Sequence, residues 1–131
     1  MSQFEDDIKK FNLMYKMQVA NSPTTHIKNE TSFVARLINF KKILLEEIEE
    51  IELIIKNEDY PVDTLIALAD LLGDIQVYCA SEMVKFGLPV DETLKIIMQS
   101  NFSKMGEDGN PIYDDRGKLL KGPNYWKPEP K

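Results

Sequence analysis

Apolar residues recur at helical spacing through most of this 131-residue chain. The pattern predicts four helices, over about residues 2–17, 31–56, 61–87 and 91–104. Ser2 and Glu5 match a capping box at the start of the first helix. Pro61 and Gly87 suit the start and the end of the third helix. We therefore expect an all-α fold, a four-helix bundle.

The first two helices each carry an apolar stripe that we expect to be buried. The stripe of the first helix consists of Phe4, Ile8, Phe11 and Tyr15. The stripe of the second consists of Phe33, Leu37, Phe40, Leu44, Ile48, Ile51 and Ile55. Glu47 and Glu50 lie on the flank of this second stripe, with Ile43 one turn before and Ile54 one turn after. A carboxylate strip bracketed by isoleucines is not expected to be fully solvated.

The third helix is apolar almost all round, which predicts a central position in the bundle. Asp70 and Asp74 lie one turn apart on it, so we expect both to point into the molecule. Carboxylates are costly to bury unless they are paired, hydrogen-bonded or holding a cation. Asp91 is the expected N-cap of the fourth helix.

Glycine and proline exclude long helices after residue 105. We expect an irregular C-terminal tail or a small hairpin that turns at Asp115-Arg116-Gly117. The expected organisation is a helical catalytic domain at residues 1–105, with a tail at 106–131 packing on it. Lys121 and Tyr125 in this tail are suited to folding over an anion or an aromatic base.

Composition narrows the choice of function and compartment. The formal net charge of −6 argues against binding of a nucleic acid polymer, although it leaves nucleotides open. Cys79 is the only cysteine, so no intrachain disulfide can form and a cytoplasmic protein is expected. We find no signal-peptide pattern and no stretch of about 18 apolar residues, so no membrane association is expected.

The two acidic clusters together favour a metal site. Glu46 and Glu50 are spaced i,i+4 and can reach one cation, while Glu47 is close enough to bridge or to activate water. The alternative for this cluster alone is an ordinary charged helix surface. Carboxylates without histidine or cysteine suit Mg²⁺, with Mn²⁺ as a substitute, and His26 is the only histidine.

Two further pairs of residues are candidates for substrate contacts. Asn101 and Lys104 are spaced i,i+3 at the end of the fourth helix and could contact a metal-bound phosphate. The alternatives are a backbone-capping amide for Asn101 and a solvated charge for Lys104. Phe11 and Tyr15 could stack on a base, although core packing is the better interpretation for Phe11.

These motifs together resemble a known family. Glu46-Glu47-x-x-Glu50, the Asp70/Asp74 helix and Asn101-Phe-Ser-Lys104 are similar to the all-α, MazG-like NTP pyrophosphohydrolases. The segments 100–113 and 117–125 resemble a stand-alone subgroup with members like dUTPase and phosphoribosyl-ATP pyrophosphohydrolase. The resemblance covers almost the whole chain. One departure is Leu71, which stands where the family pattern has a glutamate three residues before Asp74.

The resemblance implies a Mg²⁺-dependent pyrophosphohydrolase of nucleotide-pool metabolism, converting a (d)NTP to a (d)NMP and pyrophosphate. Glu47 would act on the attacking water, and the metal ligands would be Glu46, Glu50, Asp70 and Asp74. The substrate-binding residues would be Asn101, Lys104, Lys121, Tyr125 and Tyr15. Alternatives are a non-catalytic helical interaction protein, or a MazG-like hydrolase of another nucleotide diphosphate bond.

We also expect self-association. The second helix carries Ile38, Leu45 and Leu53 away from its main stripe, and exposed apolar surface of this kind is typical of an interface. The resemblance implies a homodimer or a dimer of dimers, with the active site near the subunit contact.

Overall fold

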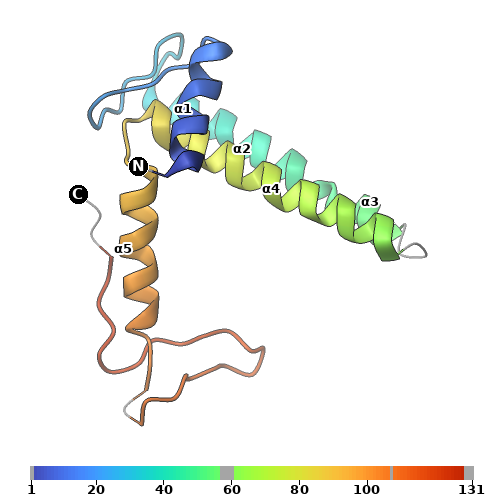
Figure 1. Ribbon diagram of the computed structural model, residues 1–131, viewed down its shortest axis with the longest axis vertical. Coiled ribbons are helices and arrows are strands. Elements are labelled where there is room, and N and C mark those ends of the chain that lie inside the picture. Colours follow the sequence, from blue (N-terminus) through green and yellow to red (C-terminus); the bar gives the residue numbers. More distant parts are fainter. Residues whose placement is uncertain (1, 57–60, 107, 129–131) are drawn as a thin grey trace. The chain divides into compact units, whose positions relative to one another are not determined.

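The computed structural model describes residues 2–56, 61–106 and 108–128, and it confirms an all-α protein (Figure 1). No strand occurs among these residues; the helices are α1 Gln3–Met14, α2 Phe33–Glu49, α3 Ile51–Lys56, α4 Pro61–Lys85 and α5 Val90–Phe102. The chain forms two compact units, one ending at Leu88 and the other beginning at Pro89.

Helix α1 begins as expected but ends earlier. The Ser2 Oγ accepts a hydrogen bond from the Glu5 backbone N–H at 3.2 Å, as an N-cap does. The helix ends at Met14 rather than Met17, and Lys16 adopts a left-handed conformation with φ of 58°. An L-residue in that conformation cannot continue a right-handed helix.

The buried face of α1 differs from the expected one. Its buried residues are Glu5, Ile8 and Asn12, whereas the predicted stripe members Phe4, Phe11 and Tyr15 are exposed. Hydrogen bonds explain how a polar residue occupies this face. The Asn12 amide donates to the Ser81 carbonyl at 3.1 Å, and the Ser81 hydroxyl donates to Asn12 Oδ1 at 2.6 Å. This exchange fastens α1 to α4 and satisfies both buried groups.

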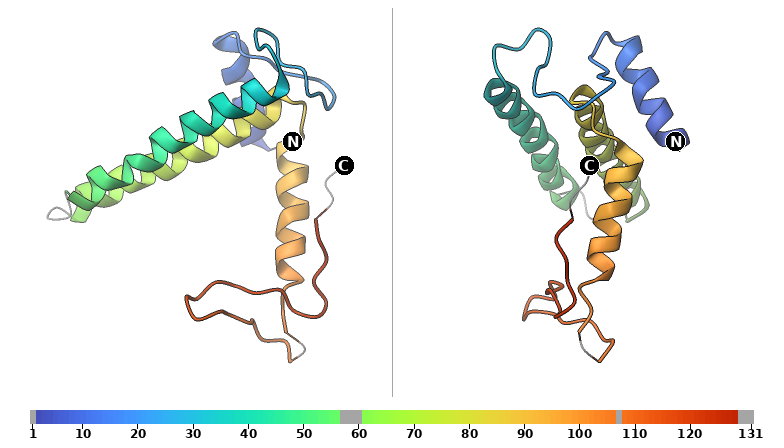
Figure 2. Two further views of the ribbon diagram at one scale, coloured as in Figure 1. Left: turned by 180° about the vertical axis from the view of Figure 1, so that it is seen from behind. Right: turned by 90° about the vertical axis from the view of Figure 1, so that its left-hand side faces the viewer.

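Helices α2 and α3 run side by side with α4 as a long antiparallel hairpin (Figures 1 and 2). The sequence predicted one helix over 31–56, but it is interrupted at Glu50, whose backbone N–H bonds to the Glu47 carbonyl at 3.1 Å. This bond spans three residues rather than four, so the last turn of α2 is tightened. Neither proline nor glycine stands at the break.

The face of α2 turned toward α4 is the flank of the predicted stripe. Arg36 is buried, while Ile43, Glu47 and, in α3, Ile54 are half-buried. Most of the predicted stripe is instead exposed in the single chain, namely Phe33, Leu37, Ile48, Ile51 and Ile55. The helical spacing of apolar residues identified an apolar face of α2, but it did not identify the face that packs against α4.

A buried ion pair joins α2 to α4. The Arg36 guanidinium donates from Nε to Glu82 Oε2 at 2.7 Å and from Nη2 to Oε1 at 2.8 Å. The two side chains are only 9% and 8% exposed. Glu30 and Lys85 extend the pair, at 3.3 Å from Arg36 and 3.4 Å from Glu82.

Helix α4 is central to the first unit, since it packs against α1, α2 and α3. By length and composition alone, its Val62–Lys85 stretch is apolar enough to cross a membrane, with a mean hydropathy of 1.3. The expectation that no segment would pass this test is therefore wrong. Only 17% of this stretch is buried within the chain, and the buried Arg36–Glu82 pair lies near its C-terminal end.

Gly87 ends the α4 segment as predicted, with φ of 70°. A side chain here is excluded by space as well, because a Cβ would lie 2.1 Å from the Ser22 carbonyl oxygen. The loop between α1 and α2 is tied to this end of α4 by backbone bonds. The Ala20 N–H donates to Val84 at 3.1 Å, and the Thr24 N–H to Phe86 at 2.9 Å.

The second unit consists of α5 and the tail. Pro89, not Asp91, is the N-cap of α5; Asp91 lies in the first turn. The predicted turn is present, with an antiparallel bridge between Tyr113 and Leu119 and Gly117 at φ of 80°. The Ser100 hydroxyl donates to the Trp126 carbonyl at 2.7 Å, which holds the end of the tail on α5.

We predict that Glu82→Gln lowers the free energy of unfolding by about 3–5 kcal/mol, because the Arg36 charge then stays buried without its carboxylate. Urea denaturation at one fixed protein concentration measures the change. Glu52→Gln, on the exposed side of α3, is the matched control and should alter stability by less than about 0.5 kcal/mol. Equal stability of the two variants would refute the structural role of the pair.

Candidate active site

The Arg36–Glu82 pair sets the register of the helices that carry the acidic residues. Glu47 stands eleven residues after Arg36 on α2, and Leu71 stands eleven residues before Glu82 on α4. In an antiparallel hairpin these two positions are opposite each other. Asp70 and Asp74 lie on either side of Leu71 along α4, so both are close enough to Glu47 for their charges to act on it.

Electrostatics places four carboxylates in one cluster. The pKa of Glu47 is raised above its ordinary value, first by burial, then by the negative charges of Glu50, Asp74 and Asp70. No lysine or arginine is among the groups that shift it. Like charges disfavour ionisation of one another, so the three neighbouring carboxylates favour the protonated form of Glu47.

Tyr78 belongs to the same cluster. Its hydroxyl forms a hydrogen bond with the Glu47 carboxylate, which opposes the rise in the Glu47 pKa. The pKa of Tyr78 is itself raised, mainly by burial and then by the Glu47 charge. The sequence analysis assigned no role to Tyr78. Its position one turn after Asp74 was the available signal.

The donor set fits a hard cation, although it does not form a finished metal site. Glu47 Oε2 is buried without a hydrogen-bond partner, which is costly unless something positive is bound there. All the neighbouring acidic groups offer oxygen, the donor that Mg²⁺ prefers. Within the described part of the chain, however, no three such side chains converge closely enough to hold a metal ion as they stand.

The remaining acidic candidates are placed differently. Glu46 is on the exposed side of α2 and is not among the charges that act on Glu47. Asp70 and Asp74 are exposed rather than directed into the molecule, which corrects the expectation of buried aspartates. Leu71, where the family pattern has a glutamate, is buried and only 3% exposed. Asp70 is the neighbouring carboxylate that acts on Glu47.

The predicted phosphate-binding residues gather in the second unit. The Lys121 and Lys104 Nζ atoms lie 4.9 Å and 6.0 Å from the centroid of the Tyr125 ring. Both distances are within reach of a cation–π attraction. Asn101 is half-buried on α5, one turn before Lys104. The tail and the end of α5 thus bring two cations and one aromatic ring together.

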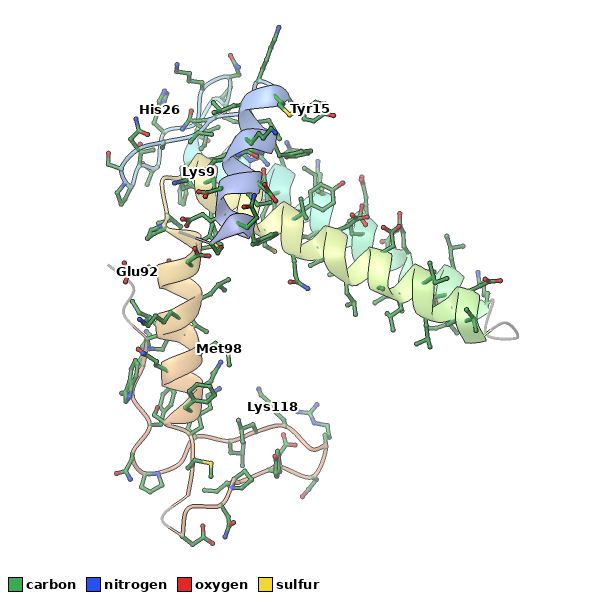
Figure 3. The ribbon with its side chains drawn as sticks, viewed as in Figure 1. Lys9, Tyr15, His26, Glu92, Met98 and Lys118 are labelled. Carbon is green, nitrogen blue, oxygen red and sulfur yellow. The ribbon has the colours of Figure 1, made fainter. Side chains whose placement is uncertain are left out.

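Tyr15, the predicted base-stacking residue, stands at the end of α1 and is 64% exposed. Its ring lies 4.9 Å from that of Phe11, with the planes inclined by 52°. Figure 3 shows Tyr15 at the end of α1 nearest the loop that carries His26. Phe11 is not in the core, so these two rings are both accessible.

Comparison with known proteins finds similar chains among solved structures. Among solved structures the chain is similar to a candidate NTP pyrophosphohydrolase from Exiguobacterium sp. 255-15, at 25% sequence identity and a TM-score of 0.50. The similarity covers 98% of this chain and 90% of that one. No family model and no curated protein matches the chain.

We predict that Asp74→Asn leaves the metal-free protein as stable as the wild type or more stable at pH 7. A raised pKa of Glu47 means that the folded state favours its protonated form. Stability therefore falls as the pH rises from the ordinary glutamate pKa through the raised one. Removing the Asp74 charge reduces this loss.

The advantage of Asp74→Asn should shrink at acid pH, where Glu47 is protonated in the folded and unfolded states alike. Thermal unfolding in EDTA between pH 4 and 8 measures this, with Asp63→Asn on the exposed surface of α4 as the control. Severe unfolding of Asp74→Asn alone would instead assign Asp74 to the support of the fold.

Proposed function

We propose that this protein is a Mg²⁺-dependent nucleoside triphosphate pyrophosphohydrolase, which converts a (d)NTP and water to a (d)NMP and pyrophosphate. The observation that carries the proposal is the grouping of Glu50, Asp70 and Asp74 around Glu47, whose pKa is raised by burial and by these three negative charges. The similarity to the Exiguobacterium protein supports the broad family and a general nucleotide hydrolase. The MazG-like subgroup and the metal are our proposal.

Glu50, Asp70 and Asp74 would hold the metal, and Glu46 would join them through a change of its side-chain position. When bound, Mg²⁺ would neutralise charge on the triphosphate and on the carboxylates. Bound Mg²⁺ would therefore offset the electrostatic repulsion among the carboxylates of the cluster. Mn²⁺ has the same preference for oxygen donors and would substitute.

Glu47 would act as the general base. Its pKa is raised toward the working pH, and Oε2 has no hydrogen-bond partner, so this oxygen is free to accept a proton from water. The water oxygen then bonds to the α-phosphorus while the bond from this phosphorus to the α–β bridging oxygen breaks. The electron pair of that bond leaves with the pyrophosphate. The Tyr78 hydroxyl would keep the Glu47 carboxylate in position.

The cationic group of the second unit would bind the phosphate chain. Lys104 and Lys121 supply the positive charge, and the Asn101 amide supplies a neutral donor. Tyr125 holds the two lysines near each other through its ring. Tyr15, with its exposed ring, would stack on the base. Which base is preferred is a separate question that a substrate panel answers.

The decisive experiment supplies all eight common nucleoside triphosphates with Mg²⁺ and identifies the products. We expect pyrophosphate and a monophosphate from at least one substrate. Glu47→Gln should lower kcat by about 10²–10⁴-fold, because the general base is removed, while nucleotide binding persists. Glu49→Gln, an exposed carboxylate on the same helix and outside the cluster, is the matched control and should keep wild-type kcat.

Each alternative gives a different result in this experiment. Release of orthophosphate alone would assign the protein to hydrolysis of another diphosphate bond. No product and no Mg²⁺-dependent thermal shift with a nonhydrolysable nucleotide would favour a non-catalytic interaction protein. Wild-type turnover by Glu47→Gln would refute the role of Glu47 while leaving the overall reaction standing.

We further propose that the active form is a homodimer or a dimer of dimers. The supporting observation is apolar surface on the hairpin, with Ile38, Leu45, Leu53, Leu65 and Ile66 all exposed in the single chain. Two copies joined on this surface would bury it, as closed two-fold assemblies do.

Sedimentation equilibrium should therefore give at least twice the 15.1 kDa mass of the chain at micromolar concentration. Changing Leu45 and Leu53 to glutamate should shift the protein to the monomer and reduce activity, because charge is placed within the contact. Lys10→Glu, on the exposed side of α1, should leave the assembly intact. A fully active wild-type monomer would sink the idea.

A further inference from the structure

A cavity lies at the end of the helical hairpin where α2 begins and α4 ends, away from the carboxylate cluster. It has a volume of about 680 Å³ and is formed by the loop between α1 and α2, the start of α2 and the end of α4. This size is within the range of small-molecule sites, roughly 300–1,000 Å³. At 1.5 Å per residue, Arg36 and Lys85 each stand about 16 Å along their helices from Glu47 and Asp74.

The walls of this cavity are positively charged in a protein that is negative overall. Lys16, Lys28, Arg36 and Lys85 line it, against one lining carboxylate, Glu30. Lys85 and Arg36 are paired with acidic residues. Lys16 and Lys28 form no ion pair with any residue that the structure describes. Their two charges are therefore an unbalanced excess at the cavity.

Arg36 also has donors to spare. Its guanidinium has five N–H groups, and the bonds to Glu82 and Glu30 use three of them. The remaining two have no partner among the described residues, although the side chain is only 9% exposed. Donors of a guanidinium that lines a cavity and have no protein partner fit a site that an acceptor-rich ligand completes.

The cavity wall is held in place by one amide side chain. Gln18 donates to the His26 carbonyl at 2.8 Å and to the Lys85 carbonyl at 2.9 Å, and its Oε1 accepts from the Lys28 N–H at 2.8 Å. These bonds tie both sides of the loop to the end of α4. Figure 3 shows His26 on this loop. The cavity is therefore formed before any ligand binds.

We infer that this cavity binds the phosphate group of a small molecule, as a site separate from the carboxylate cluster. A phosphate oxygen accepts from the spare N–H groups of Arg36, and the charges of Lys16 and Lys28 neutralise the anion. The apolar side chains of Met17, Val19 and Ile27 also line the cavity. They offer a surface for the uncharged body of a phosphorylated metabolite, which free phosphate lacks.

The test is a titration of the full-length, metal-free protein followed by ¹H–¹⁵N NMR, at constant ionic strength. The probes are inorganic phosphate, pyrophosphate and AMP. We expect saturable shifts of the Gln18, Lys28 and Asn29 backbone amides. The double variant Lys16→Gln and Lys28→Gln should bind at least about tenfold more weakly. The double variant Lys10→Gln and Lys41→Gln, which removes the same charge elsewhere on the surface, should bind like the wild type.

Asp74→Asn should also bind like the wild type, which separates this site from the proposed active site. Tighter binding of AMP than of the inorganic anions would identify a phosphorylated metabolite, and equal binding would identify the free anion. The inference is overturned if these amides show no saturable shift below about 10 mM. It is equally overturned if the two lysine double variants lose affinity alike, because that result means unspecific attraction by surface charge.

Discussion

The buried Arg36–Glu82 ion pair is the interaction on which the rest of the first unit depends. Two charges lose their water there, a cost that only good geometry and paired hydrogen bonds offset. The fork of two bonds, at 2.7 Å and 2.8 Å, fixes both rotation and translation of α2 against α4. The same two helices carry the acidic residues, so this contact also influences which residues of α4 lie near Glu47.

The two ends of the helical hairpin contrast in their charge balance. Around Arg36, ion pairs with Glu82 and Glu30 hold the charged side chains of the two helices, and Lys85 adds to them. Around Glu47, burial and the negative charges of Glu50, Asp74 and Asp70 raise the Glu47 pKa. The buried Arg36–Glu82 pair stabilises the hairpin, so the fold can tolerate repulsion among the carboxylates near Glu47. Stability and reactivity are thereby assigned to different turns of the same two helices.

The sequence was informative where the signal is local. Caps such as Ser2 and Gly87 located helix ends, and i,i+4 spacing located Asp70 and Asp74 on the helix that meets Glu47. It was wrong about burial, since Phe11 is exposed and Asn12 is buried. Periodicity reports that a face is apolar, but the partner that covers it is set by long-range contacts. Hydrogen bonds to a distant helix, like that from Asn12 to Ser81, leave no local pattern.

The helix break at Glu50 and the neighbours of Glu47 also could not be predicted from local sequence patterns. Neither glycine nor proline marks the break, so nothing in the composition of the segment announces it. Tyr78 stands one turn after Asp74 in the sequence. Its contact with Glu47, however, depends on the helix register, to which the distant Arg36–Glu82 pair contributes. The residues of the site could therefore be identified from the sequence more readily than their positions relative to one another.

The closeness of Gly87 to Ser22 has a consequence for how this protein can diverge. No other residue fits at Gly87, and Gln18 joins three backbone groups at once, so both positions are locked by the fold. Lys16 and Lys28, by contrast, have exposed side chains that form no ion pair with the described residues. The cavity is therefore maintained by residues that the fold requires, whereas its positive charge depends on two lysines that can be substituted without disturbing the fold. Related proteins can thus keep the cavity and bind a different ligand in it.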